Sequence, residues 1–115
     1  MRLTSDFWTA ALMRRVRAEG GFAYLTRRGS NEAGTIFILD RLSSGDVDLY
    51  GPAPQSFYTD ESDRDERCFI KILAGVKEAV AVEKLEKELQ FDADLWLVEF
   101  ENYNPQQLPF NIVKA

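Results

Sequence analysis

With 115 residues, 45% of them hydrophobic and 29% charged, the chain has the size and composition of a single soluble globular domain. It contains no histidine and one cysteine, Cys68, so it cannot by itself supply a catalytic histidine, a thiolate zinc site or an internal disulfide. Zinc hydrolases and enzymes with a Ser-His-Asp or Cys-His arrangement are therefore excluded, unless a partner provides the missing residues.

The net charge of −5 is unevenly distributed along the chain. Residues 1–30 carry six arginines against two acids, whereas residues 31–66 carry nine acids against two arginines. A dipolar surface of this kind favours self-association or an oppositely charged partner, unless folding brings the two segments together.

The sequence favours a cytoplasmic location. No apolar run approaches the roughly 18 residues that a membrane span needs, and no signal-peptide pattern is found at the N-terminus. The single cysteine agrees with a reducing compartment. We therefore expect a cytoplasmic protein that does not bind membranes.

The first predicted element is a helix from about Ser5 to Glu19. Thr4 and Asp6 are typical of a helix start, because a hydroxyl caps the first turn and an acid suits the positive end of the helix dipole. Gly20 and Gly21 end the helix. Apolar residues recur at three- and four-residue spacing and predict one apolar face: Phe7, Trp8, Ala11, Leu12 and Val16.

Three strands are predicted next, over residues 22–28, 35–42 and 47–50. Short turns at 29–34 and 43–46 join them, so we expect an antiparallel meander. The strand over residues 35–42 is apolar at both parities, which is typical of a central strand that is covered on both faces.

The second half of the chain adds a loop over residues 52–67, a fourth strand over 68–73, a helix over 78–90 and a last strand over 95–101. Val82, Leu85 and Leu89 form the predicted core line of this second helix.

The predicted fold class is α+β, an antiparallel sheet of about four to five strands with two helices, in the order α-β-β-β-β-α-β. Residues 1–101 form this single domain. Residues 102–115 are a C-terminal tail that is either packed along the body or docked on a partner.

The two faces of the predicted sheet can be covered in two ways. The helices take opposite faces, or they share one face while a second copy of the chain covers the other. The apolar stretch from Leu108 to Val113 is a further candidate, either by wrapping around the body or by adding a strand. A homodimer is therefore one of our expectations.

The turn from Tyr50 to Gln55 is the first candidate site, because Pro52 and Pro54 give it a definite shape. Two interpretations remain open. The turn ends an edge strand, or it lines an apolar pocket near a tryptophan, with Tyr50 and Gln55 as polar groups that contact a ligand.

Four arginines form the second candidate site. Arg14 and Arg17 belong to the first helix, and Arg27 and Arg28 end the first strand, so the fold could bring four guanidinium groups to one surface. Planar guanidinium groups bind phosphate and carboxylate well. The alternative is that these arginines pair with acids of the same chain. The acidic net charge argues against nucleic acid as the partner.

Acidic residues are weaker candidates. Asp40, Asp46 and Asp48, or Glu99 with Glu101, could converge on a magnesium or calcium ion. Their spacing matches neither a calcium-binding loop nor a nuclease motif, so we interpret them as solvent-facing strand residues and expect neither metal nor cofactor. Cys68 lies in an apolar run and is interpreted as a small core residue.

Several segments together match the pattern of one family. They are Met1-Arg2-Leu3 with Trp8, Arg14-Arg15, Arg17-Ala18-Glu19-Gly20, Arg27-Arg28-Gly29, Glu32-Ala33-Gly34-Thr35-Ile36-Phe37, Asp48-Leu49-Tyr50-Gly51-Pro52-Ala53-Pro54-Gln55 and Phe91-Asp92-Ala93-Asp94-Leu95-Trp96-Leu97-Val98-Glu99. With them the chain resembles, over nearly its full length, an alphaproteobacterial family of unknown function, the domain-of-unknown-function family 1491. The resemblance implies a compact cytosolic bacterial protein with no assigned activity and no catalytic residues to carry over.

Two functions remain open on this basis. The favoured one is a non-catalytic adaptor or regulatory module that binds a protein partner, because the sequence contains no nucleophile with a matching base. The alternative is a small enzyme or sensor that binds a nucleotide or a phosphorylated metabolite. In that case the four arginines would hold the phosphate, and the turn from Tyr50 to Gln55 would orient the ligand.

Overall fold

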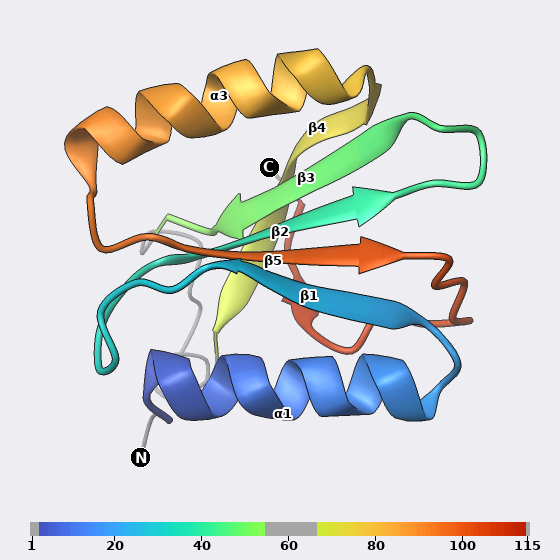
Figure 1. The fold of residues 1–115 in the computed structure, drawn as a ribbon, viewed down its shortest axis with the longest axis horizontal. Coiled ribbons are helices and arrows are strands. Elements are labelled where there is room, and N and C mark those ends of the chain that lie inside the picture. The colour runs from blue at the N-terminus through green and yellow to red at the C-terminus, as the bar shows by residue number, and fades with distance from the viewer. Residues whose placement is uncertain (1–2, 55–66, 115) are drawn as a thin grey trace.

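The computed structural model describes residues 3–54 and 67–114. Their helices are α1 (Ser5–Ala18) and α3 (Glu78–Phe91), and their strands are β1 (Phe22–Arg27), β2 (Ile36–Arg41), β3 (Val47–Pro52), β4 (Cys68–Val76), β5 (Trp96–Glu101) and β6 (Asn111–Ile112). The strands form one sheet in the order β1-β5-β2-β3-β4-β6, with a helix on either side of it (Figure 1). The predicted α+β class with two helices is therefore confirmed for the described residues.

The predicted antiparallel sheet of four to five strands is wrong, because the sheet is mixed and has six strands among the described residues. β2 pairs with β5 in parallel, and so does β4 with β6. The predicted meander fails at its first pair, since β1 pairs with β5 and not with β2. The cause is the crossover through α3. It carries the chain from β4 across the sheet, so that β5 inserts between β1 and β2 and runs parallel to β2.

Helix α1 begins as predicted and buries Leu12 and Val16 of its predicted apolar face, but the buried surface shifts at the first turn. The Thr4 hydroxyl accepts a hydrogen bond of 3.2 Å from the Phe7 amide, which caps the first turn. Phe7 itself is exposed, whereas Ser5 is fully buried. The reason is a close approach to the loop before β2, where the Ser5 hydroxyl donates a 2.7 Å hydrogen bond to the carbonyl of Gly34. Neither helix of the described residues is long and apolar enough to cross a membrane.

The two helices cover opposite faces of the sheet, and each face has its own apolar core. Ile36 and Ile38 of β2 belong to the core beneath α1. Phe37 and Leu39 of the same strand belong to the core beneath α3. The apolar residues at both parities of β2 therefore reflect a central strand covered on each side, which was the first of the two predicted arrangements.

The C-terminal residues pack along the α1 face of the sheet. Tyr103 is buried there, and the Phe110 ring meets Tyr50 edge-on with centroids 5.2 Å apart. β6 then pairs with β4, and the Val113 amide donates a 2.8 Å hydrogen bond to the carbonyl of Phe69. The segment after β5 thus runs back across the α1 face to the opposite edge of the sheet, next to β4 (Figure 1).

Candidate functional site

The four arginines of the predicted anion site are divided between the two ends of α1. The Arg17 guanidinium donates a 2.7 Å hydrogen bond to the carbonyl of Ala23, beside the last turn of the helix. Arg28 lies 3.0 Å from the Asp6 carboxylate, in the first turn. An α-helix rises about 16 Å over the intervening 11 residues, so the two positions cannot hold one small anion together.

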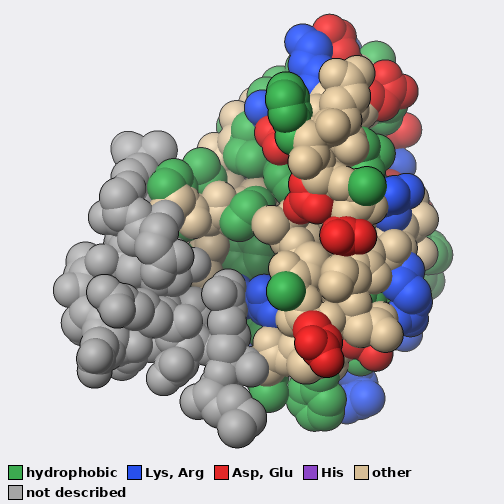
Figure 2. Space-filling view, turned by 90° about the vertical axis from the view of Figure 1, so that its left-hand side faces the viewer, with side chains coloured by type: hydrophobic (Ala, Val, Ile, Leu, Met, Phe, Trp, Pro, Cys, Tyr) green, Lys and Arg blue, Asp and Glu red, His purple; other side chains and the backbone are tan. Residues whose placement is uncertain are grey.

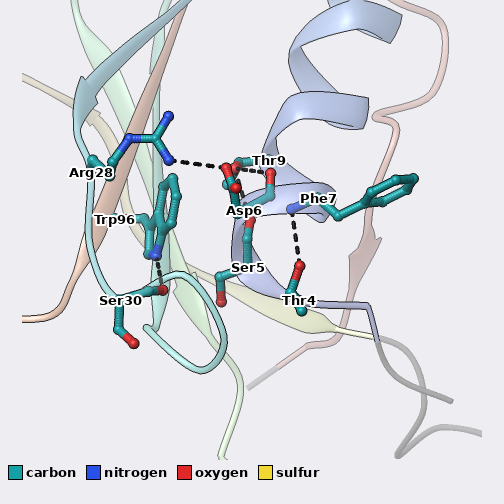
Figure 3. Close-up of polar contacts among 8 residues, drawn as sticks. All are labelled: Thr4, Ser5, Asp6, Phe7, Thr9, Arg28, Ser30 and Trp96. Carbon is teal, nitrogen blue, oxygen red and sulfur yellow. Dashed lines mark hydrogen bonds and ion pairs between the residues drawn. The ribbon is translucent and has the colours of Figure 1, made fainter.

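The contacts of these arginines lie within the same chain. Figure 2 shows acidic and basic side chains interspersed over the described part of one face, without a single basic patch. Figure 3 shows Arg28 reaching Asp6 across the face of Trp96, with its guanidinium 5.1 Å from the ring centroid. Arg27 donates a 2.8 Å hydrogen bond to the carbonyl of Ala93, and Arg14 is exposed on α1. Ligand binding by these arginines stays a prediction.

The turn after β3 does not present Tyr50 to solvent. Tyr50 is buried in the core beneath α1. Burial first, and then the charges of Asp48 and Asp40, raise the pKa of its hydroxyl to about 12. Gln55, the other predicted polar group, lies outside the described residues. Tyr50 therefore acts as a core residue.

Gly51 serves close packing within the sheet. A β-carbon at this position would lie 2.4 Å from Ile72 Cδ1 and 2.8 Å from Phe37 Cε2. Beyond it, Pro52 and Cys68 line a hollow of about 260 Å³ at the start of α1. The prediction that Cys68 is buried is confirmed. Arg67 of the same hollow is engaged within the chain, since it donates a 2.9 Å hydrogen bond to the carbonyl of Leu3.

The acidic residues behave differently from the prediction at two positions. Asp40 and Asp48 are only 6% and 8% exposed, so the interpretation as solvent-facing residues is wrong for both. The C-terminal segment covers Asp40, and Asp48 lies directly opposite Asp40 in the β2–β3 pair. Asp46 lies 3.3 Å from the Lys77 ammonium. Among the described residues, no three His, Cys, Asp or Glu side chains gather at one place.

A groove that the sequence did not predict lies on the opposite face, between α3 and the sheet. Its volume is about 230 Å³. Apolar side chains form its walls, from α3 on one side and from β2 and β5 on the other: Val82, Leu85, Leu89, Leu39 and Leu97. The groove exists because α3 packs against β3 and β4 and leaves the β5 and β1 side of its face less covered.

Two exposed aromatic residues of β1 lie on the same face of the sheet as this groove. Phe22 and Tyr24 lie opposite Glu101 and Glu99 of β5, on the α3 face of the sheet. They are 51% and 48% exposed. Val82 of α3 is 43% exposed, although the helical pattern placed it on the core line. The sequence pattern predicts that Val82 is buried, so this exposed apolar surface could not be recognised from the sequence.

The rim of the groove is acidic. Glu78, Glu86 and Glu99 line it together with one cation, Arg41. Arg41 is held between two of these acids, 2.8 Å from Glu78 and in direct contact with Glu99. Burial opposes its charge, but these contacts outweigh burial and raise the pKa of Arg41 above its ordinary value. Three acids against one paired arginine leave the rim net negative.

Fold and groove together define a small α+β protein whose mixed sheet is covered on one face and partly open on the other. The chain belongs to the DUF1491 family, described as protein of unknown function, whose sequence model matches residues 3–109. It is 46% identical to a protein from A. tumefaciens, whose solution structure superposes with a TM-score of 0.84 over 100% of this chain and 98% of that one. A DUF1491 protein from Caulobacter crescentus, 25% identical, has a crystal structure that matches with a TM-score of 0.76 over 98% of this chain and 99% of that one. No curated protein is detectably similar.

Proposed function

We propose that the protein is a non-catalytic binding module that takes an amphipathic, positively charged segment of a partner protein into the groove between α3 and the sheet. The observation that carries this proposal is the combination of apolar walls with a net negative rim. The cytoplasmic location that the sequence favours belongs to the same proposal.

The exposed side chains around the groove support a protein partner. Aromatic residues are enriched at the centres of interfaces because they bury large areas with few rotatable bonds. Phe22 and Tyr24 are exposed on the same face beyond the groove, on the edge strand β1. A segment that inserts apolar side chains would be flanked by lysine or arginine, because opposite charges across a rim favour encounter and register.

The charge of the rim disfavours a second copy of the chain as the occupant. A two-fold interface brings the same surface patch of both copies together. Glu78, Glu86 and Glu99 would then meet their own counterparts, and like charges across an interface oppose association. The competing function, binding of a phosphorylated ligand by an arginine cluster, is not favoured because Arg17 and Arg28 lie at opposite ends of α1.

The test uses a photo-crosslinking amino acid placed at Val82, with Phe91 as the matched position. Both are exposed apolar residues of α3, and only Val82 lines the groove. We expect crosslinks from position 82 to a basic amphipathic segment of one partner, and none to that partner from position 91. A synthetic peptide of the crosslinked segment should bind the wild-type protein at least about tenfold more tightly than Val82→Asp, and Phe91→Asp should bind like the wild type.

Three results would contradict the proposal. They are a peptide affinity that Val82→Asp leaves unchanged, a crosslinked segment that is acidic or wholly polar, and a crosslink to a second copy of the chain with a dimer in sedimentation experiments.

A further inference from the structure

A second cavity, on the other face of the sheet, has features that the groove does not explain. It has a volume of about 640 Å³ and lies between the end of β2 and the C-terminal segment. Asp40 and Leu42 of the β2 end line it, and its other lining residues all come from residues 103–112. Since it lies on the α1 face, its role is independent of the function proposed above.

Asp40 is an unsatisfied acid at the base of this cavity. Its side chain lines the cavity while the residue is only 6% exposed. Its Oδ1 oxygen is sealed from solvent and has no hydrogen-bond partner within the described part of the chain, so a ligand in the cavity would pair with the carboxylate through its other oxygen. Burial first, and then the charge of Asp48, raise the pKa of Asp40 to about 6, while Lys71 opposes this shift. An unpaired buried carboxylate is costly, and its presence calls for a group that completes it.

The neighbouring acid, Asp48, has a partner for each of its two carboxylate oxygens. Asp48 lies directly opposite Asp40 in the β2–β3 pair. One of its oxygens accepts a 2.7 Å hydrogen bond from the Gly75 amide, and the other lies 3.5 Å from the Lys71 ammonium. Two carboxylates and one ammonium leave this cluster net negative above pH 6, so the missing component is a cation.

The surroundings indicate an organic cation in preference to a metal ion. The Lys71 ammonium lies 5.7 Å from the centroid of the Tyr50 ring, so a primary ammonium already fits between a carboxylate and an aromatic face in this cluster. Around Asp40 the cavity offers aromatic, aliphatic and neutral amide side chains, including Phe110, Leu108 and Gln107. A calcium ion would need six to eight oxygen ligands, whereas no three His, Cys, Asp or Glu side chains gather at one place among the described residues.

We propose that this cavity binds the primary ammonium group of an aliphatic amine, with Asp40 as its counter-ion. Phe110 and Leu108 contact the aliphatic chain, and the side-chain amides accept the remaining ammonium hydrogens or contact the far end of the ligand. A free diamine and a lysine side chain of a peptide share this chemistry.

The experiment is a calorimetric titration of the full chain at pH 7.5 with three probes: 1,4-diaminobutane, Nα-acetyl-lysine amide and the neutral analogue 1,4-butanediol. We expect at least one of the two amines to bind and the diol not to bind. Stronger binding of the diamine indicates a free metabolite, and stronger binding of the lysine derivative indicates a peptide side chain. Asp40→Asn should weaken amine binding at least about thirtyfold, because the charge is removed from a buried pair.

The matched control is Asp46→Asn, an acid of the β2–β3 hairpin that does not line the cavity and pairs with Lys77. It should bind the amine like the wild type. In the wild type, affinity should fall as the pH drops through about 6, where Asp40 takes up a proton. Asp48, Lys71, Tyr50 and Tyr103 also face this cluster, and Glu19 contacts the Tyr103 hydroxyl.

The proposal is overturned if neither amine binds at millimolar concentration, if Asp40→Asn binds as tightly as the wild type, or if a magnesium or calcium salt at millimolar concentration displaces the amine. Far-UV circular dichroism and a thermal melt of Asp40→Asn show whether the variant is folded. The pH titration of the wild type tests the proposal without any substitution.

Discussion

Asp40 and Asp48 lie directly opposite each other on β2 and β3, but only Asp48 has its carboxylate satisfied by the protein. Both acids project toward the α1 face and are buried there, with Asp40 beneath the C-terminal segment. The Asp40 carboxylate is therefore a buried charge without a partner, which lowers the free energy of unfolding. A cationic ligand that pairs with this carboxylate would recover that free energy.

Asp40→Asn should stabilise the protein at neutral pH. The pKa of Asp40 is raised from 3.8 to about 6, so the folded state holds this proton more tightly than the unfolded chain does. The contribution of protonated Asp40 to the free energy of unfolding is therefore fully present below pH 4, and it is lost as the pH rises through about 6. At pH 7.5 the ionised group should cost on the order of 2–3 kcal/mol, and Asn removes that cost.

This prediction is checked by urea unfolding of both proteins at pH 4 and pH 7.5. We expect Asp40→Asn to be the more stable of the two at pH 7.5 and the two proteins to converge at pH 4. A variant that is less stable than the wild type at pH 7.5 would show that the carboxylate is paired in the folded protein.

Gly34→Ala should destabilise the protein strongly. A β-carbon at this position would lie 2.3 Å from the carbonyl oxygen of Asp94 and 2.7 Å from Trp96 Cδ1. The loop before β2 would have to move away from β5, at a cost of about 2–3 kcal/mol. The neighbouring Ala33 is exposed, so Ala33→Ser should change the free energy of unfolding by less than about 0.5 kcal/mol. Equal melting temperatures of the two variants would contradict the close approach of the loop to Trp96.

Phe110→Ala should loosen the C-terminal segment. Its ring contacts Tyr50 and Phe69 with centroid distances of 5.2 Å and 5.1 Å. Loss of a partly buried ring that anchors the segment should cost about 2–3 kcal/mol. Amide exchange should then increase over residues 103–113, and Tyr50 should become accessible to solvent.

Phe91→Ala is the matched control for this change, because Phe91 is 89% exposed at the end of α3. Its free energy of unfolding should equal that of the wild type within error. If Phe110→Ala also leaves stability and amide exchange unchanged, the segment does not pack on the sheet in solution.

Local patterns in the sequence determined the two helices and the central strand. The helix start at Thr4 follows from side-chain capping, and the extent of α3 follows from its 3.6-residue apolar repeat, which are interactions between near neighbours in the chain. The double-sided burial of β2 follows from its apolar residues at both parities. Each of these features depends on side chains a few residues apart.

Which strands are neighbours and which residues are buried depends on contacts between distant segments of the chain. β5 lies between β1 and β2 because α3 returns the chain across the sheet, and no local pattern specifies a pairing between positions as distant as Ile36 and Trp96. For the same reason Asp40 looks like an ordinary polar strand residue in the sequence. Its burial comes from a segment that starts more than sixty residues later, at Tyr103, and so does the cavity that it lines.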